Sequence, residues 1–382
     1  MSAYITGIGV RLPNEPITND RIESVLGTMN GHSSRVKDLI LKRNAINTRY
    51  YAIDPATGRQ THTNAQLTAE AIHALGENCG LDLDEIEVLG CGTSVPDQLI
   101  PSHASMVHGL IGCPPCELVS TSGVCCSGMA ALKYGYLSVL SGTSHNAVVT
   151  GSDVVSPGLL AKYFRSTTHG NGSDLEAHPQ LAFDREFLRF MLSDGAGAML
   201  IEERPRTESL ALRIDWMDMV SFANELETCM YLGAVKAKDG SLRTWREIEN
   251  HDNLWEDGYF TLSQDVRLLS ENIVANAMRR SFQKILAKRQ LTPEAIDWLL
   301  PHLSSYFFEQ PIRATLAEMG FDIPSEKWFT NLDRKGNTGA ASMFIMLEEL
   351  SSSGRLKSGD RLLCAIPESA RFSFAYMHLT VV

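Results

Sequence analysis

The chain has 382 residues, of which 44% are hydrophobic, and carries a formal net charge of -11 at pH 7. At roughly 150 residues per domain, a chain of this length suggests two or three domain-sized units. The acidic balance argues against nucleic acid as a partner. No apolar run approaches the ~20 residues that a membrane helix needs, and the first residues lack a signal-peptide layout. We therefore expect a cytoplasmic protein without a membrane-spanning segment.

Short β-rich runs alternate with amphipathic helices, and the pattern occurs twice. In the first part we predict strands at 3–10, 88–94, 146–151 and 193–201 and helices at 63–79 and 128–140. A polar link follows at 203–206. In the second part we predict a long helix at 265–289 and strands at 298–302 and 361–366. Such alternation indicates an α/β fold with buried central sheets.

The eight cysteines are scattered along the chain, which is typical of reduced thiols rather than a disulfide framework. Cys113 and Cys116 have CxxC spacing, but no second pair with metal-ligand spacing accompanies them. We therefore interpret this segment as a surface loop, with a zinc or redox site as the less favoured alternative.

The most informative stretch, Thr121–Leu132, places Cys125 and Cys126 in a turn of small residues just before a helix. The positive end of a helix dipole favours thiolate over thiol, so this position suits a nucleophile. The alternative is that both cysteines are small buried hydrophobic residues, as free cysteines often are.

Two further candidates follow in the second part, at strand-to-loop junctions of the kind that often carry function in α/β proteins. His302 lies just past a short apolar strand, and Asn337 lies between glycines before a helix start. Taken singly, they are readily explained as a structural histidine and a helix cap. Together with a thiolate, imidazole and amide groups suit attack on a thioester and stabilisation of an enolate.

The segments Cys126–Met129, Pro301–His302 and Gly336–Ser342 resemble the Cys-His-Asn triad of the type III ketoacyl-ACP synthases of the thiolase superfamily. The resemblance spans nearly the whole chain. It implies an α/β thiolase fold with five layers (αβαβα), made of two pseudo-twofold-related halves that each hold a mixed sheet between helices. We place these halves at 1–205, with the nucleophile, and 206–382, with the histidine and asparagine. The resemblance also implies a homodimer.

Longer stretches are similar to the ketosynthase/cyclases that build dialkylresorcinols, cyclohexanediones and bacterial stilbene precursors: 49–55, 61–68, 91–98, 301–308 and 367–372. That resemblance implies an acyl chain, α,β-unsaturated in the simplest case, loaded on cysteine and joined to a β-ketoacyl thioester. A Claisen-type and a Michael-type bond would close a 1,3-cyclohexanedione ring. Within the superfamily, linear chain extension from a malonyl carrier and hydroxymethylglutaryl-type synthesis remain alternatives.

The resemblance assigns roles residue by residue. Cys126 would take the acyl group, His302 and Asn337 would stabilise the enolate, and the N–H groups of Cys126 and Ala370 would form the oxyanion hole. The chain departs from the family pattern at 367–371, where a glycine-rich loop is expected. There Arg371 is a candidate for binding a carboxylate, or else forms an ion pair with Glu368.

Asp153 is a further candidate acid or base, with loop capping as the alternative. No metal or redox cofactor is required for this chemistry. The resemblance leaves open whether coenzyme A or an acyl carrier protein presents the thioesters. Five basic residues, Arg35, Lys37, Lys42, Arg43 and Arg49, form either a docking surface for an acidic carrier or a solvated helix face. A set of large apolar residues lines an acyl tunnel or belongs to the core: Phe164, Phe183, Phe187, Phe190, Trp216, Phe222 and Met230.

Two other classes compete. A hydrolase would use Cys125 in a nucleophile elbow, although that pattern requires glycine where Ser127 stands. A non-catalytic partner subunit of a ketosynthase would usually lose triad residues, and this chain keeps all three.

Overall fold

The computed structural model describes residues 2–29, 31–164, 186–206, 210–237, 239–249, 251–255 and 257–382. The principal strands are β1 (Tyr4–Arg11), β4 (Val88–Thr93), β5 (Glu117–Ser122), β6 (Asn146–Asp153), β7 (Gly195–Glu202), β8 (Leu212–Ser221), β13 (Trp298–Pro301), β14 (Arg361–Glu368) and β15 (Ser373–Val381). Short strands lie toward one end of the molecule: β2 (Ile17–Thr18), β3 (Thr48–Arg49), β9 (Met230–Tyr231), β10 (Ala234–Lys236), β11 (Leu242–Thr244) and β12 (Ser263–Gln264). The α-helices are α1 (Ile22–Leu26), α2 (Lys37–Asn44), α3 (Asn64–Cys79), α4 (His103–Ile111), α5 (Ser127–Ser141), α8 (Val266–Asn272), α9 (Arg279–Arg289), α10 (Glu309–Glu318), α11 (Leu332–Lys335) and α12 (Ser342–Ser352).

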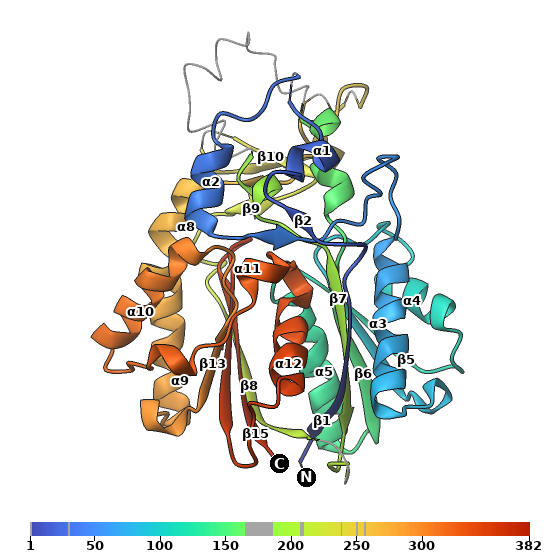
Figure 1. Ribbon diagram of the computed structural model, residues 1–382, viewed down its shortest axis with the longest axis vertical. Helices are drawn as coiled ribbons and strands as arrows, with labels where there is room; N and C mark the ends of the chain where they lie inside the picture. The colour runs from blue at the N-terminus through green and yellow to red at the C-terminus, as the bar shows by residue number, and fades with distance from the viewer. Residues whose placement is uncertain are drawn as a thin grey trace.

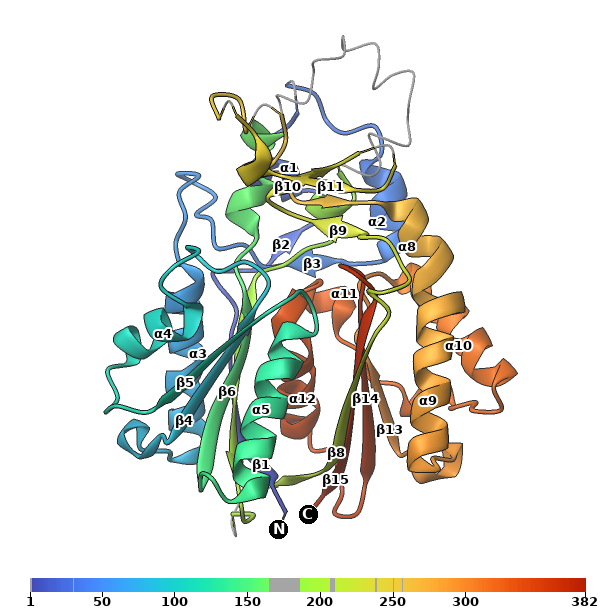
Figure 2. The same cartoon turned by 180° about the vertical axis from the view of Figure 1, so that it is seen from behind.

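The principal strands join in one mixed sheet with the order β13-β14-β15-β8-β1-β7-β6-β4-β5. Pairing is parallel between β13 and β14 and between β4 and its two neighbours, and antiparallel elsewhere. The seam between β1 and β8 consists of two residue pairs, Tyr4 with Arg213 and Ile5 with Leu212. Because this seam is so short, the sheet opens into two wings, β13-β14-β15-β8 on one side of the seam and β1-β7-β6-β4-β5 on the other (Figures 1 and 2).

Helices α5 and α12 lie between the two wings, α3 and α4 cover the outer face of one wing, and α9 and α10 cover the outer face of the other (Figures 1 and 2). This arrangement gives five layers and confirms the predicted thiolase-type α/β fold. The proposed boundary near residue 205 lies in the connection between β7 and β8. Within the described residues, no helix is long and apolar enough to cross a membrane.

Local sequence explains the helix that covers the first wing. The side chain of Thr63 accepts a hydrogen bond from the Gln66 backbone N–H, and the Gln66 side chain accepts one from Thr63. This capping box satisfies donors that the first helical turn leaves unpaired. Gly80 ends α3 in a left-handed conformation, which favours glycine. The predicted helix at 63–79 is therefore confirmed, with Thr63 as its cap.

The two central helices bring the halves of the chain into close contact through glycine. A Cβ atom on Gly128 of α5 would lie 2.5 Å from the Ala340 carbonyl oxygen, and one on Gly151 of β6 would lie 2.3 Å from it. Ala340 precedes α12. Only glycine allows this approach, which sets the start of α5 against the segment that carries Asn337.

The predicted helix at 265–289 is continuous in direction but changes its winding. Between α8 and α9, residues Ile273–Met278 form the π-helical turn η6. Such turns are rare and are often found at functional sites. Here Ile273, Val274 and Met278 line a cavity that also contains His302 and Asn337, so the π-helical turn forms part of the wall of that cavity.

Candidate active site

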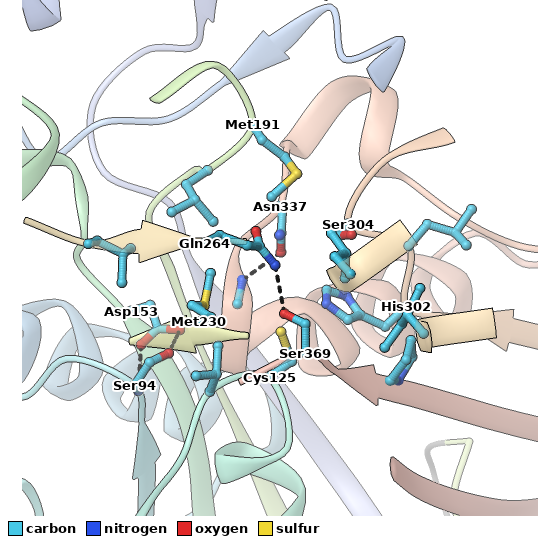
Figure 3. A pocket seen from close by; sticks show the side chains of 18 of the residues that line it. Ser94, Cys125, Asp153, Met191, Met230, Gln264, His302, Ser304, Asn337 and Ser369 are labelled. Carbon is cyan, nitrogen blue, oxygen red and sulfur yellow. Dashed lines mark hydrogen bonds between the residues drawn. The ribbon is translucent and has the colours of Figure 1, made fainter. Parts of the chain in front are cut away.

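A cavity of about 250 Å³ lies at the ends of the strands where the two wings diverge. Residues from both parts of the chain line it. Its polar lining includes Ser94, Cys125, Asp153, Ser193, Gln264, His302, Ser304, Asn337 and Ser369. Figure 3 labels all of these side chains except Ser193 and shows that they come from different elements. The structure thus brings together a cysteine, a histidine and an asparagine that are distant in the sequence.

His302 directly follows β13, and its backbone N–H donates to the Ala365 carbonyl 2.8 Å away. The side chain is 3% exposed, and its Nε2 has no hydrogen-bond partner among the described residues. Burial lowers the pKa of His302 to about 4, because an uncharged ring tolerates desolvation better than an imidazolium. At neutral pH the cavity therefore contains a neutral imidazole.

Asn337 follows the left-handed Gly336 and is held on both sides. Its backbone N–H donates to the Met191 carbonyl at 3.2 Å, and its carbonyl accepts from the Ser193 N–H at 2.8 Å. The side-chain Oδ1 accepts from the Gly339 N–H at 3.1 Å. The amide oxygen is thereby engaged, and the Nδ2 group is the end of the side chain suited to donate toward a ligand in the cavity.

The two adjacent thiols face different surroundings. Cys125 lines the cavity with His302 and Asn337, whereas Cys126 does not line it. The Cys126 Sγ lies 3.4 Å from the Ile366 carbonyl oxygen, and the residue is 4% exposed. Cys126, which the family pattern predicts as the nucleophile, therefore lies outside the lining of this cavity, whereas its neighbour belongs to it. The reason is local: the turn before α5 directs consecutive side chains to opposite sides, one toward the cavity and one toward β14.

The expected oxyanion hole has a different geometry as well. The backbone N–H groups of Val124 and Cys126 both donate to Oε2 of Glu368, each at 2.9 Å. A carboxylate therefore lies at the N-terminus of α5, where a peptide N–H was expected to bind substrate oxygen. In this conformation Cys126 has no N–H available for that role.

Glu368 also changes the electrostatics of the cysteine pair. Burial, and then the Glu368 charge, raise the pKa of both the Cys125 and the Cys126 thiol well above the usual value. The sequence-based expectation was a lowered pKa from the helix dipole. The positive helix end is instead occupied by a carboxylate, so both cysteines are thiols at neutral pH.

The remaining predicted loop residues are separated in the structure. Arg371 is exposed, and its Nε donates to the Leu226 carbonyl at 3.1 Å. It neither lines the cavity nor pairs with Glu368 among the described contacts, so the predicted ion pair is not formed, and the carboxylate-binding role stays a prediction. The carbonyl of Ala370 accepts from the Cys229 N–H at 3.0 Å. The left-handed backbone conformation of this loop falls on buried Phe372, with φ 57°, rather than on Ala370.

Asp153 at the end of β6 acts as an anchor. Its carboxylate accepts from the Thr93 hydroxyl at 3.1 Å, the Ser94 N–H at 2.8 Å, the Ser94 hydroxyl at 2.6 Å and the Ala340 N–H at 2.8 Å. Burial raises the pKa of Asp153, while these hydrogen bonds act in the opposite direction. Four donors on two oxygens favour the predicted loop-capping role over proton transfer. The carboxylate joins β4, β6 and the start of α12.

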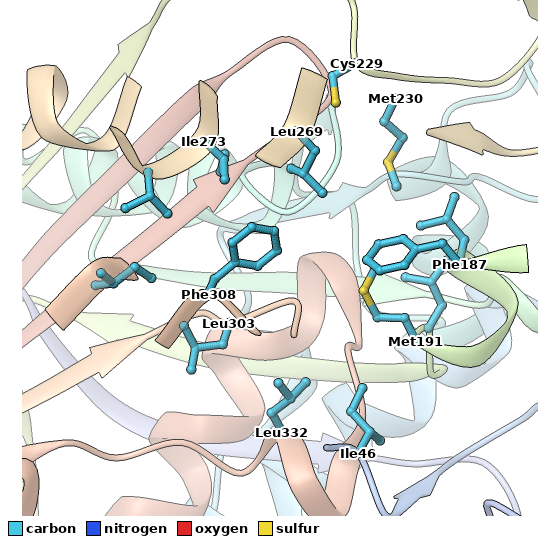
Figure 4. Close-up of a cluster of buried hydrophobic side chains, with 14 of the residues drawn as sticks. Ile46, Phe187, Met191, Cys229, Met230, Leu269, Ile273, Leu303, Phe308 and Leu332 are labelled. Carbon is cyan, nitrogen blue, oxygen red and sulfur yellow. The ribbon is translucent and has the colours of Figure 1, made fainter. Parts of the chain in front are cut away.

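The apolar lining of the cavity includes residues from α8, η6, α10 and the segment after β13, with Leu269, Ile273, Leu303 and Phe308 among them. Figure 4 shows several of these side chains in the larger hydrophobic cluster. Of the large apolar residues predicted for a tunnel, Met230 lines the cavity. Others are buried core outside its lining: Phe164, Phe187, Phe190, Trp216 and Phe222. Phe183 lies outside the described residues.

Gln264 and Ser369 are among the polar residues of the cavity that were not predicted. Gln264 of β12 and Ser369 after β14 are joined by a hydrogen bond of 2.9 Å from Gln264 Nε2 to Ser369 Oγ (Figure 3). No motif marks Gln264 in the sequence. Ser369 belongs to the segment that departs from the glycine-rich family pattern, and that departure was the available signal.

Two surface predictions have structural outcomes. Arg49 of the basic cluster is fully buried and donates to the Asn19 side chain and the Phe190 carbonyl, so it is no part of a docking surface.

The CxxC loop lies near His108, with candidate ligand atoms of His108, Cys113 and Cys116 within 4.8 Å of one another. His108 Nε2 lies 3.1 Å from the Cys113 carbonyl and 3.2 Å from that of Pro114. Through these contacts the His108 side chain holds the backbone of the loop at Cys113 and Pro114.

Residues 286–366 match the family described as 3-oxoacyl-[acyl-carrier-protein] synthase III, C terminal. The chain is 27% identical over 361 residues to beta-ketoacyl-[acyl-carrier-protein] synthase III 2 of Deinococcus radiodurans, which covers 94% of this chain and 89% of that protein.

Solved structures show the same fold. AbyA1, a tetronic acid condensing enzyme, superposes with a TM-score of 0.76 at 20% identity, with 99% of each chain covered. The 3-oxoacyl-[acyl-carrier-protein] synthase III of Aquifex aeolicus gives a TM-score of 0.68 at 22% identity, again over 99% of each chain. Residues 286–366 are thus similar to the C-terminal part of the 3-oxoacyl-[acyl-carrier-protein] synthase III family, and the whole chain shares the fold of these solved structures.

Proposed function

We propose that this protein is an acyltransferase that condenses two acyl thioesters through an acyl-cysteine intermediate. The observation that carries the proposal is the meeting of Cys125, His302 and Asn337 in one largely apolar cavity. A thiol accepts the acyl group from the first thioester, and the released thiol takes up the proton. Neutral His302 and the Asn337 amide then stabilise the enolate oxygen of the second substrate.

The geometry favours Cys125 as the acyl acceptor, because its side chain lines the cavity. Cys126, the position that the family pattern indicates, would serve only after two changes. Its Sγ would have to leave the Ile366 carbonyl, and Glu368 would have to release its backbone N–H.

We further propose that the condensation closes a ring. The stretches similar to the dialkylresorcinol and cyclohexanedione enzymes support this product class, as does the loss of the glycine-rich loop at 367–371. Each new carbon-carbon bond uses a carbanion formed by loss of a proton. In the Michael-type step a proton returns to the α carbon of the acceptor, and in the Claisen-type step the cysteine leaves as the protonated thiol. Water then hydrolyses the remaining thioester and releases its thiol, and loss of carbon dioxide from the resulting β-keto acid leaves a 1,3-cyclohexanedione.

Space for two acyl chains supports a two-substrate reaction. A second cavity of about 200 Å³ shares Val95, Val155, Leu232 and Leu262 with the first. Chains that extend from one polar site can therefore enter two adjoining spaces. The first cavity is largely apolar and is compatible with aryl and branched-alkyl groups alike, whereas Gln60 and Asp97 are among the residues that line the second.

The decisive experiment mixes the protein with an α,β-unsaturated acyl thioester and a β-ketoacyl thioester, followed by mass spectrometry of products and intact protein. A cyclohexanedione, with or without its carboxylate, together with an acyl-cysteine adduct supports ring formation. A linear β-ketoacyl product, formed only from a malonyl donor, would assign ordinary chain extension. Free acid without a carbon-carbon bond would assign a cysteine hydrolase. This is the second candidate function, because Cys125 lines the cavity.

We propose an acyl carrier protein as the donor of at least one thioester. Arg35, Lys42 and Arg43 are exposed near α2 and suit an acidic partner. An Arg43→Glu variant is expected to raise KM for carrier-bound substrate severalfold while leaving KM for the coenzyme A thioester unchanged. Equal effects on both would exclude this surface.

We propose a homodimer, and the edge of the sheet supports it. Strand β5 pairs with β4 on one side and ends the strand order, and its Glu117, Ser120 and Ser122 are exposed. Such an edge can pair with a second copy of itself. Sedimentation at twice the 42.1 kDa mass of the chain is the expected result.

A further inference from the structure

The cavity contains a second polar pair besides His302 and Asn337. Gln264 and Ser369 come from segments 105 residues apart and are joined by the hydrogen bond from Gln264 Nε2 to Ser369 Oγ. Both side chains line the same cavity as Cys125 and Asn337 (Figure 3). A ligand attached to the thiol or facing it would therefore meet this pair.

Gln264 has an unmet hydrogen-bonding requirement. The residue is 4% exposed, and its Oε1 has no partner within the part of the chain that the structure describes. A buried polar atom without a partner costs roughly 1–3 kcal/mol, so native proteins rarely keep one without a reason. A ligand that carries an O–H or N–H group would remove this cost.

The pair offers two complementary functions side by side. Gln264 Oε1 accepts a hydrogen bond, and the Ser369 hydroxyl, which accepts from Gln264 Nε2, retains its own O–H for donation. A β-ketoacyl thioester matches both, because its keto form presents an acceptor oxygen and its enol form presents an O–H at the same position. A simple acyl chain has neither group at that carbon.

We propose that Gln264 and Ser369 bind the β-oxygen of the β-ketoacyl thioester and so select it as the second substrate. This inference rests on the proposed condensation and adds its determinant of substrate choice. Ser369 donates to the keto oxygen, and the enol O–H donates to Gln264 Oε1. The binding step breaks and forms no covalent bond.

Another donor on these substrates could satisfy Gln264, namely the amide N–H of the pantetheine arm. The two sources differ in a measurable way. The arm is present on both thioesters, whereas the β-oxygen is present only on the second. Loss of pantetheine binding would therefore slow cysteine acylation and condensation together.

The test compares Gln264→Leu, Gln264→Glu and Ser369→Ala with the wild-type protein and with Gln283→Leu, which changes an exposed glutamine on α9. Cysteine acylation by a simple acyl thioester is followed by intact-protein mass, and condensation by KM for the β-ketoacyl thioester. For Gln264→Leu we expect KM to rise about tenfold, as loss of a hydrogen bond to a buried group predicts. Acylation should change less than twofold, and Gln264→Glu, which retains an acceptor, should recover part of the loss.

Three results would overturn the inference. The first is an unchanged KM for the β-ketoacyl thioester in Gln264→Leu, and the second is a parallel loss of cysteine acylation. The third is a rise in KM that Gln264→Glu does not reduce, accompanied by altered thermal unfolding. Failure of the proposed function is recognised separately, because the wild-type protein would then form no carbon-carbon bond. If the wild-type protein condenses and the Gln264 variants match it, only the inference about substrate choice fails.

Discussion

The Glu368 carboxylate accepts the backbone N–H of Cys126 at 2.9 Å, across 242 positions of sequence. The interaction joins the end of β14 to the start of α5, and it places a negative charge where the helix would otherwise stabilise an anion. The cysteine pair is consequently less acidic than its position before a helix suggests.

Replacement of Glu368 by glutamine is expected to lower the pKa of both neighbouring thiols. The amide oxygen retains an acceptor for the Val124 and Cys126 N–H groups while the charge that disfavours thiolate is removed. The pH profile of alkylation by iodoacetamide should therefore move to lower pH. Glu77→Gln, at an exposed position on α3, is the matched control. An unchanged profile would mean that the carboxylate has no influence on the thiols.

Single alanine variants of the two cysteines separate their roles. Cys125→Ala should remove the acyl adduct seen by intact-protein mass spectrometry, because Cys125 is the thiol that lines the cavity. Cys126→Ala should retain most of the adduct and lose about 1 kcal/mol or more of stability, since it truncates a buried side chain. The opposite pattern would restore Cys126 as acceptor and require Glu368 to move during the reaction.

His302 makes stability depend on pH in a defined window. Its pKa in the folded protein is about 4, below the usual 6.5 of the unfolded chain, so protons bind more tightly to the unfolded state. Its contribution is fully present above pH 6.5 and is lost as pH falls toward 4, by roughly 3 kcal/mol in total. His302→Gln should flatten the slope of unfolding free energy in that window, measured by urea titration at several pH values. His32→Gln, at an exposed position, should leave the slope unchanged.

The contact between the halves depends on a missing side chain at Gly151. A Cβ there would lie 2.3 Å from the Ala340 carbonyl oxygen and 2.7 Å from a Phe344 ring carbon. Gly151→Ala should therefore destabilise the protein by about 1–3 kcal/mol in urea unfolding. Gly109→Ala on the exposed face of α4 has open space and should stabilise the helix by roughly 0.5–1 kcal/mol. Equal effects would show that the close approach has no energetic weight.

The sequence supported the α/β class and the main strands because their apolar runs and caps are local signals. His302 and Asn337 were found from motifs, and they do share one cavity. Strands β5, β8 and β15 were not predicted; β15, for example, is buried at nearly all of its residues and lacks the alternation that marks a half-buried strand. The π-helical turn η6 was also missed, since no glycine or proline marks it.

The direction of the cysteine side chains could not be obtained from the motif. It depends on the turn at 123–126 and on a carboxylate that reaches the helix from the other half of the chain. The same is true of Gln264, whose role depends on a partner 105 residues away. Long-range contacts of this kind leave no periodic trace in the sequence.

Part of the apolar wall of the cavity comes from elements that carry none of the three reacting side chains. Cys125, His302 and Asn337 lie in the segments next to α5, β13 and α11, whereas η6 and α10 contribute apolar residues to the wall. Substitutions in these helices can therefore admit longer or bulkier acyl chains without moving the reacting groups. A lineage of such proteins would diversify its products while keeping one chemistry.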